Sequence, residues 1–355
     1  MFSWKKHMEQ VSQNNTRDHA LDFLKIAATL VIVLHHYERA FGLHFETLNF
    51  GNGKFYFGYA VELFFMISGF VAFFSVKKIQ DGMNFDRYFS GKVLRLLPLA
   101  ALSTTVFAAM FVIVWGTKNF SLFKVIVTAF CVQQGGPFNE FLVNSHLWYL
   151  SVLLICYAFF FLVVRTGQRL QIDWRYGCFF MILLGASITS ASWDLPYLNE
   201  FAARGYMAFF TGLLLAAVLK EHRPGCLAFV VSLAIVIITV LLLVFRFEIM
   251  EYGLRYILVF VFFPALIVFF ETAPLQRILD HRILGTMAQI AFNVYIWHFD
   301  FNTFCAVAND IFKLGIDFTT RKAEFIVLLL IMAIGTFSFY LIERPVTKWI
   351  KKIRT

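Results

Sequence analysis

Long apolar runs separated by short polar segments dominate this chain. Ten of the runs are about 17 to 22 residues long, enough for a helix to cross a hydrocarbon layer of about 30 Å. An eleventh apolar run, residues 120–134, is shorter and contains Lys124. The pattern predicts an all-α, polytopic membrane protein with about ten transmembrane helices. The predicted spans are residues 20–37, 56–76, 95–115, 145–164, 176–192, 203–219, 226–245, 254–271, 285–306 and 323–342.

The distribution of Lys and Arg gives the expected orientation. If the N-terminus is cytoplasmic and residues 120–134 do not cross, cytoplasmic segments hold 20 basic residues and outer segments hold 10. Lys25, inside the first span, completes the 31. If residues 120–134 crossed, every later segment would change sides and the bias would vanish. The positive-inside rule therefore favours cytoplasmic termini and a run 120–134 that is re-entrant or lies at the outer interface.

Composition supports this class and excludes others. Hydrophobic residues make up 60% of the chain and charged residues 15%, against about 25% charged in soluble domains. The formal charge of +9 comes from residues that flank apolar spans, which indicates contact with an anionic lipid bilayer rather than nucleic acid. The five cysteines form no CxxC pair and no Cys/His cluster at metal spacing, so we expect no metal site.

The chain is expected to hold one transmembrane domain, residues 20–345. A polar cytoplasmic tail (residues 1–19) precedes it, and a basic cytoplasmic tail (residues 346–355) follows it. The first tail lacks the apolar core of a cleaved signal peptide, so the first span must act as its own insertion signal.

The first span carries the sharpest candidate chemistry. Lys25 and His36 are eleven residues apart, which places them on one helix face about 16 Å apart along the axis. Ionisable side chains inside a span are costly and indicate function. A neutral imidazole can accept a proton from a hydroxyl that attacks an acyl carbonyl, although an interfacial histidine that contacts lipid headgroups would give the same pattern.

Three later stretches add polar groups to the spans. Glu62 lies in the outer part of the second span, where it could orient a histidine, and Ser68 and Gly69 follow it. Small residues either let helices pack closely or make room for a ligand. Lys92 and Arg95 share one face at the cytoplasmic start of the third span, where they would bind phosphates or anchor the helix. Finally, His298 and Asp300 lie two residues apart in another span and should face a polar cavity, and His146 and Trp148 begin a span.

Six segments, in order, resemble the acyltransferase 3 family of integral membrane acyltransferases. The resemblance covers almost the whole chain. Lys25 and His36 match the family's Arg/Lys-x10-His pattern, and Lys92 stands where the RxxR motif has its first arginine. The matching segments are LDFLKIAATLVIVLHH, ELFFMISGF, GKVLRLLP, HLWYLS, AFNVYIWHF and LIERP.

The resemblance implies an O-acyltransferase of the bacterial inner membrane that transfers an acyl group, expected to be acetyl from acetyl-CoA, to a surface or lipid-linked glycan. It implies His36 as catalytic base and Lys25 as its motif partner, and we expect Glu62 to assist them. Donor contacts would come from Lys92, Arg95, Ser68 and Gly69, and acceptor contacts from His35, Trp148 and His298. Because Lys cannot make the bidentate grip of Arg, the donor geometry at Lys92 should differ from that of the usual motif.

A proton-coupled transporter or flippase is the alternative, since intramembrane Lys, His and Glu side chains could also relay protons. Inverted repeats and paired, Gly- or Pro-broken helices would favour it. No such repeat is visible in the sequence. The identity of the acceptor sugar and the length of the acyl group stay open.

Overall fold

The computed structural model describes residues 17–42, 57–117, 120–138, 143–245 and 249–354, and this part of the chain contains no β-strand. The first half contains α2 (His19–Phe41), η1 (Phe57–Tyr59), α3 (Ala60–Ala72), η2 (Phe73–Ser75), α4 (Val76–Gln80), α5 (Phe85–Trp115), α6 (Leu122–Ala129), η3 (Ser145–Leu147) and α7 (Trp148–Leu170). The second half contains α8 (Trp174–Ala191), α9 (Glu200–Glu221), α10 (Cys226–Phe245), α11 (Ile249–Ile257), η4 (Leu258–Phe262), α12 (Phe263–Phe270), α13 (Ala273–Ile278), α14 (Arg282–Phe312), α15 (Arg321–Ser338), η5 (Phe339–Glu343) and α16 (Arg344–Arg354).

In the described ranges, each of the ten predicted spans falls on one helix or on a run of consecutive helical segments. Within the described ranges, eight helical segments are long and apolar enough to cross a membrane. The all-α, polytopic membrane architecture is therefore confirmed. The other two predicted spans form α8 and α14, and their crossing stays a prediction. The run 120–134 forms only the eight-residue α6, which at about 12 Å is too short to cross.

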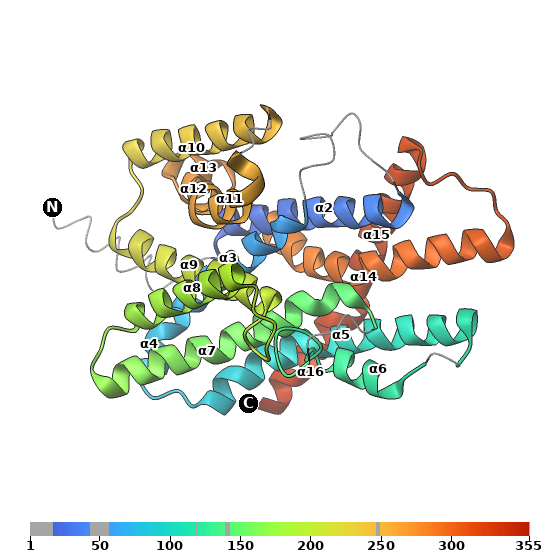
Figure 1. The fold of residues 1–355 in the computed structure, drawn as a ribbon, viewed down its shortest axis with the longest axis horizontal. Helices are drawn as coiled ribbons and strands as arrows, with labels where there is room; N and C mark the ends of the chain where they lie inside the picture. Colours follow the sequence, from blue (N-terminus) through green and yellow to red (C-terminus); the bar gives the residue numbers. More distant parts are fainter. Residues whose placement is uncertain (1–16, 43–56, 118–119, 139–142, 246–248, 355) are drawn as a thin grey trace.

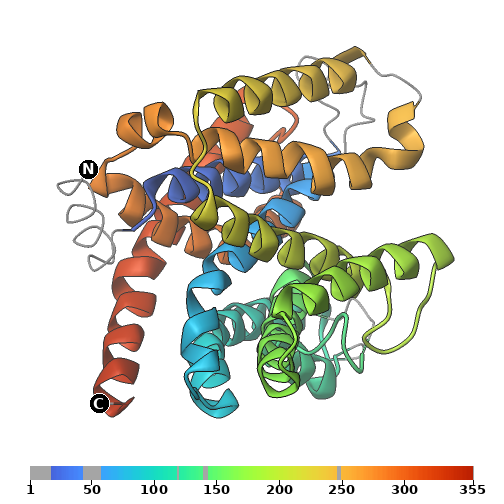
Figure 2. The same ribbon diagram turned by 90° about the vertical axis from the view of Figure 1, so that its left-hand side faces the viewer.

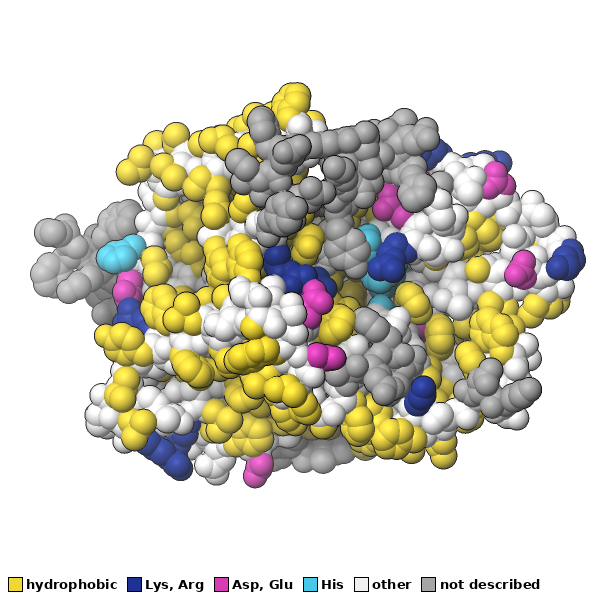
Figure 3. Space-filling model, viewed as in Figure 1, with side chains coloured by type: hydrophobic (Ala, Val, Ile, Leu, Met, Phe, Trp, Pro, Cys, Tyr) yellow, Lys and Arg dark blue, Asp and Glu magenta, His cyan; other side chains and the backbone are white. Residues whose placement is uncertain are grey.

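The apolar surface of the bundle fits this environment. Hydrophobic side chains cover much of the face in Figure 3. Along α10, Leu227 is 77% exposed and Phe245 69% exposed, and the buried side chains include the small polar Ser232 and Thr239. Exposed aliphatic and aromatic surface on this scale is stable against lipid tails rather than water.

Helix α2 lies at the centre of the bundle. Figures 1 and 2 both place α10–α13 on one side of α2 and α5–α8 on the other. Helix α14 packs along α2. The start of α2 is fixed locally, because the Asp18 carboxylate accepts hydrogen bonds from the backbone amides of Ala20 and Leu21, both at 3.1 Å, as an N-cap residue does. The helix ends at Gly42, whose φ of 66° is in the left-handed region.

A second close contact joins α3 to α9. A Cβ atom on Gly69 would lie 1.9 Å from the carbonyl oxygen of Phe209, and one on Gly212 would lie 1.9 Å from that of Met66. The two backbones therefore touch through paired glycines, as in small-residue packing between membrane helices. Any larger side chain at either position would push the helices apart.

Candidate active site

A cavity opens at the end of the bundle where α2 begins, which we call the N-terminal face. It contains about 950 Å³ of empty space, including its mouth. Side chains from α2, α3, α5, α7 and α14 line it, together with Arg17 ahead of α2. Four of the predicted site residues meet here, namely Lys25, Ser68, Lys92 and Arg95. They are separated by up to 70 positions in the sequence, so the cavity exists only because five helices converge.

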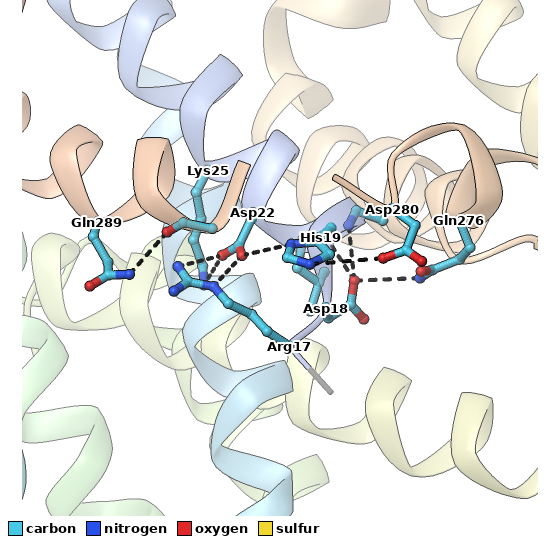
Figure 4. Close-up of polar contacts among 11 residues, drawn as sticks. Arg17, Asp18, His19, Asp22, Lys25, Gln276, Asp280 and Gln289 are labelled. Carbon is cyan, nitrogen blue, oxygen red and sulfur yellow. Dashed lines mark hydrogen bonds and ion pairs between the residues drawn. The ribbon is translucent and has the colours of Figure 1, made fainter. Parts of the chain in front are cut away.

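The mouth of the cavity is basic. Four cationic side chains and one carboxylate, that of Asp22, belong to its lining. Figure 4 shows Asp22 between its partners. Its oxygens lie 2.5 Å from Arg17 Nε and 3.7 Å from Lys25 Nζ. Because Asp22 is only 2% exposed, it holds both cations at fixed positions while the mouth keeps an excess of positive charge.

Lys92 and Arg95 lie opposite this group, on α5. Lys92 Nζ sits 4.4 Å from the centre of the Tyr157 ring, a cation–π distance. In the described ranges neither Lys92 nor Arg95 forms a salt bridge, and Arg95 is exposed. These two cations therefore remain available to an anionic ligand.

Aromatic side chains close the inner end of the cavity. The rings of Phe64, Tyr149 and Tyr295 contact one another with centroid distances of 5.7 to 6.0 Å. The Tyr149 hydroxyl lies 3.3 Å from Ser68 Oγ. Tyr295 also contacts His146 and His298 on its other side, at 5.7 and 5.6 Å. The cavity and these histidines thus share one wall.

Beyond that wall lies a cluster of histidines that includes His36. The ring of His36 is 5.0 Å from that of His298 and 5.3 Å from that of the adjacent His35. His298 is in turn 5.0 Å from His146. His36 is half-buried, whereas His146 and His298 are almost completely buried. We call His35, His36, His146 and His298 the histidine cluster.

Backbone hydrogen bonds fix the tautomers of two cluster members. His298 Nδ1 donates to the Tyr295 carbonyl oxygen at 2.6 Å, and His146 Nε2 donates to that of Ile296 at 3.0 Å. A neutral imidazole that donates from one nitrogen carries a lone pair on the other. These second nitrogens, His298 Nε2 and His146 Nδ1, are buried and have no hydrogen-bond partner among the described residues. Buried polar atoms of this kind call for a water molecule or a ligand.

A polar chain runs beside the cluster. Asn144 Nδ2 donates to Ser103 Oγ at 2.8 Å, and Ser103 donates to Asp300 Oδ2 at 2.6 Å. Asp300 Oδ1 and the amide of Asn302 are buried without a partner in the described part of the chain. The prediction that His298 and Asp300 face a polar environment is consistent with these neighbours.

The structure gives Glu62 a different partner from the expected histidine. Both carboxylate oxygens accept hydrogen bonds from Arg204 on α9, at 2.7 and 2.9 Å. Trp148, predicted to bind the acceptor, instead stacks 4.7 Å from the Arg204 guanidinium. Glu62 is fully buried and Arg204 is 7% exposed, so Glu62, Trp148 and Arg204 form a buried support for α3, α7 and α9. The sequence does contain a signal for this pair: Arg204 lies within the predicted apolar span 203–219, and a charged side chain inside a span usually has a partner.

Gly69 lies at a close helix contact, which the sequence left open as the alternative to a ligand site. It faces α9, as the contact with Phe209 shows, and it is not part of the cavity lining, whereas the adjacent Ser68 is. The residues that sequence reasoning missed are Arg17, which sits at the mouth, and Tyr295, which separates the cavity from the histidine cluster. No group of three or more His, Cys, Asp and Glu side chains in the described ranges is arranged to hold a metal ion.

Comparison with known families identifies the family of this chain. The model of the acyltransferase 3 family, described as an acyltransferase domain, matches residues 18–344. No curated protein and no solved structure matches the chain. The matched region contains the whole cavity apart from Arg17, and the whole histidine cluster. The chain therefore belongs to the acyltransferase 3 family and is a multi-pass membrane protein.

Proposed function

We propose that this protein is an O-acyltransferase that takes an acyl group, acetyl in the first instance, from acetyl-CoA and transfers it to a hydroxyl of a surface or lipid-linked glycan. The observation that carries the proposal is that Tyr295 lies between the basic cavity and the histidine cluster. One open, basic cavity ends at Tyr295, and Tyr295 touches the histidine cluster that contains His36. In the proposed reaction the acyl group and His36 would approach Tyr295 from its two sides, and the acceptor hydroxyl would reach the thioester carbonyl beside the Tyr295 ring.

The donor would enter at the N-terminal face, which the positive-inside rule makes cytoplasmic. Its phosphates would meet Lys92 and Arg95, and the Asp22-held Lys25 and Arg17 would add positive charge across the mouth. Guanidinium groups pair with phosphate in a bidentate manner, whereas lysine acts as a point charge. Arg95 should therefore contribute more to donor affinity than Lys92. The uncharged acyl end would point inward, toward Ser68 and the rings of Phe64, Tyr149 and Tyr295.

His36 would act as the general base. It would remove the proton of the acceptor hydroxyl while the hydroxyl oxygen bonds to the thioester carbonyl carbon. The carbon–sulfur bond then breaks, and the proton held by His36 passes to the departing thiolate. General-base catalysis of this type contributes about 10²- to 10⁴-fold. Lys25, about 16 Å away along α2, lies too far away to take part in proton transfer and would act on the donor.

The acceptor would approach from the opposite, outer face of a bacterial inner membrane. The lone-pair nitrogens of His146 and His298 suit the recognition of hydroxyl groups, since each accepts one hydrogen bond. His35 lies beside His36 in the same cluster. Buried acceptors of this kind favour a polyhydroxylated substrate such as a sugar.

The test is transfer of labelled acetyl from acetyl-CoA to glycan in membranes that contain wild-type protein, His36→Ala or Lys92→Ala at equal expression. We expect label on glycan with wild type, a loss of about 100-fold or more with His36→Ala, and a weaker apparent donor affinity with Lys92→Ala. Full activity of His36→Ala would contradict the mechanism. No transfer by wild type from any acyl-CoA would contradict the function and direct attention to proton-coupled transport.

A further inference from the structure

We propose that Phe64, Tyr149 and Tyr295, which we call the aromatic wall, form the end of the acyl site and restrict the donor to short acyl groups. The inference deepens the proposed function and rests on it. It concerns acyl-chain length, which the family match leaves open.

The three rings form a closed set. Phe64 lies 5.8 Å from Tyr149 and 6.0 Å from Tyr295, and the two tyrosines are 5.7 Å apart. All three line the cavity. Tyr149 and Tyr295 are 6% and 4% exposed, so little space remains around their rings. Rings from three helices therefore meet at the inner end of the cavity.

The wall also stands at the deepest level of the lining on each helix. Helices α3 and α7 run toward the N-terminal face, and Phe64 and Tyr149 are the first lining residues on them. Helix α14 runs the other way, and Tyr295 is its last lining residue. On α14 the lining extends from Ala288 to Tyr295, a depth of about 10 Å. The charged residues occupy the mouth, so a donor held there by its phosphates would extend its acyl end toward the wall.

Hydrogen bonds hold two of the rings in place. The Tyr295 hydroxyl donates to the backbone oxygen of His146 at 2.7 Å, and the Tyr149 hydroxyl lies 3.3 Å from Ser68 Oγ. Moving either ring aside would break its contact in a buried site. Phe64 has no such anchor and is half-buried. Truncation at Phe64 is therefore the simplest way to deepen the cavity.

A rigid end wall discriminates by length. Each methylene beyond the space available must displace packed side chains, and pockets discriminate about 10-fold or more per methylene. We therefore expect wild type to prefer acetyl over butyryl and hexanoyl donors.

The experiment measures kcat/KM for acetyl-, butyryl- and hexanoyl-CoA with purified protein in lipid vesicles. Phe64→Ala should raise the hexanoyl-to-acetyl ratio at least 10-fold over wild type. Leu153→Ala is the matched control, because Leu153 lines the same cavity one turn nearer the mouth. Whatever its acetyl turnover, Leu153→Ala should leave the ratio within about 3-fold of wild type.

Two results would overturn the inference, and they are distinguishable. If wild type turns over no acyl-CoA, the proposed function fails and the wall has no acyl site to limit. If wild type uses acetyl-CoA but Phe64→Ala leaves the ratio unchanged, only the role of the wall is wrong. Tyr149→Leu is a second route to the same opening if Phe64→Ala does not fold, and Tyr149→Phe should keep the wild-type ratio because it retains the ring.

Discussion

The cavity at the N-terminal face and the histidine cluster differ in the charge and the burial of their polar groups. The cavity is open and lined by cations, two of which have no ion-pair partner in the described ranges. In the histidine cluster, His146 and His298 are buried, and each has a ring nitrogen without a hydrogen-bond partner in the described ranges. An open basic cavity can receive a large anion as it stands. Buried acceptors need a ligand, or water, to become fully hydrogen-bonded.

Helix α14 joins the two regions. Its residues from Ala288 to Tyr295 line the cavity, and His298 and Asp300 belong to the other side. The contrast leads to four predictions.

The largest effect is expected where a charge is buried and paired. Arg204→Ala would leave the Glu62 carboxylate buried without its cation, a change that costs about 3–5 kcal/mol. The apparent melting temperature in detergent should fall by many degrees. Arg95→Ala, at the exposed mouth, is the control and should melt like wild type. Equal melting of both variants would mean that the Glu62–Arg204 pair does not support the bundle.

Donor binding should depend on the cavity cations and not on the histidine cluster. Arg95→Ala should raise KM for acetyl-CoA about 10-fold, since charge-assisted hydrogen bonds are worth about 1.5–3 kcal/mol, with kcat little changed. Arg95→Lys should recover part of the loss because it restores charge without the bidentate geometry. The KM for the acceptor should be the same in wild type and in both Arg95 variants. A fall in kcat with unchanged donor KM would remove Arg95 from the donor site.

The histidine cluster should show the reverse pattern. His298→Phe removes the lone pair at Nε2 and should raise acceptor KM about 2- to 10-fold, the value of one neutral hydrogen bond. Donor KM should stay the same. His298→Gln keeps a hydrogen-bonding side chain, so its acceptor KM should lie between the values for wild type and His298→Phe. A change in donor KM with His298→Phe would contradict the separation of the two regions by the aromatic wall.

The smallest effect concerns a carboxyl group next to the start of α2. Burial, together with the neighbouring Asp18, raises the pKa of Glu271, and Gln276 Nε2 donates to it at 3.2 Å. A raised folded-state pKa means that the contribution of Glu271 to stability is present at low pH and is lost as pH rises through the folded-state pKa. Glu271→Gln should therefore flatten the decline in melting temperature as pH rises from neutral to alkaline. An identical decline in both proteins would contradict this.

The membrane class and the positions of the helices were predictable from the sequence because apolar runs must match the bilayer. The face shared by Lys25 and His36 followed from helix periodicity. The partner of Glu62 could not be predicted in this way, since Arg204 is 142 positions away and only the packing of α3 on α9 brings the two residues together. The role of Gly69 was ambiguous for the same reason. A small side chain suits both a ligand site and a helix contact, and which of the two it forms depends on the helix that packs against it.

The most direct test of the account is the sidedness of the reaction. Sealed inside-out vesicles, with the protein's cytoplasmic face outward, would receive labelled acetyl-CoA, which does not cross the bilayer, and the acceptor glycan would be trapped in the lumen. The account predicts labelled glycan inside these vesicles and none in sealed right-side-out vesicles given the same donor outside. It also predicts that His36→Ala abolishes the luminal label. Equal labelling from both sides, or labelling only when the donor is on the outer side, would contradict a cavity that receives the donor at the N-terminal face.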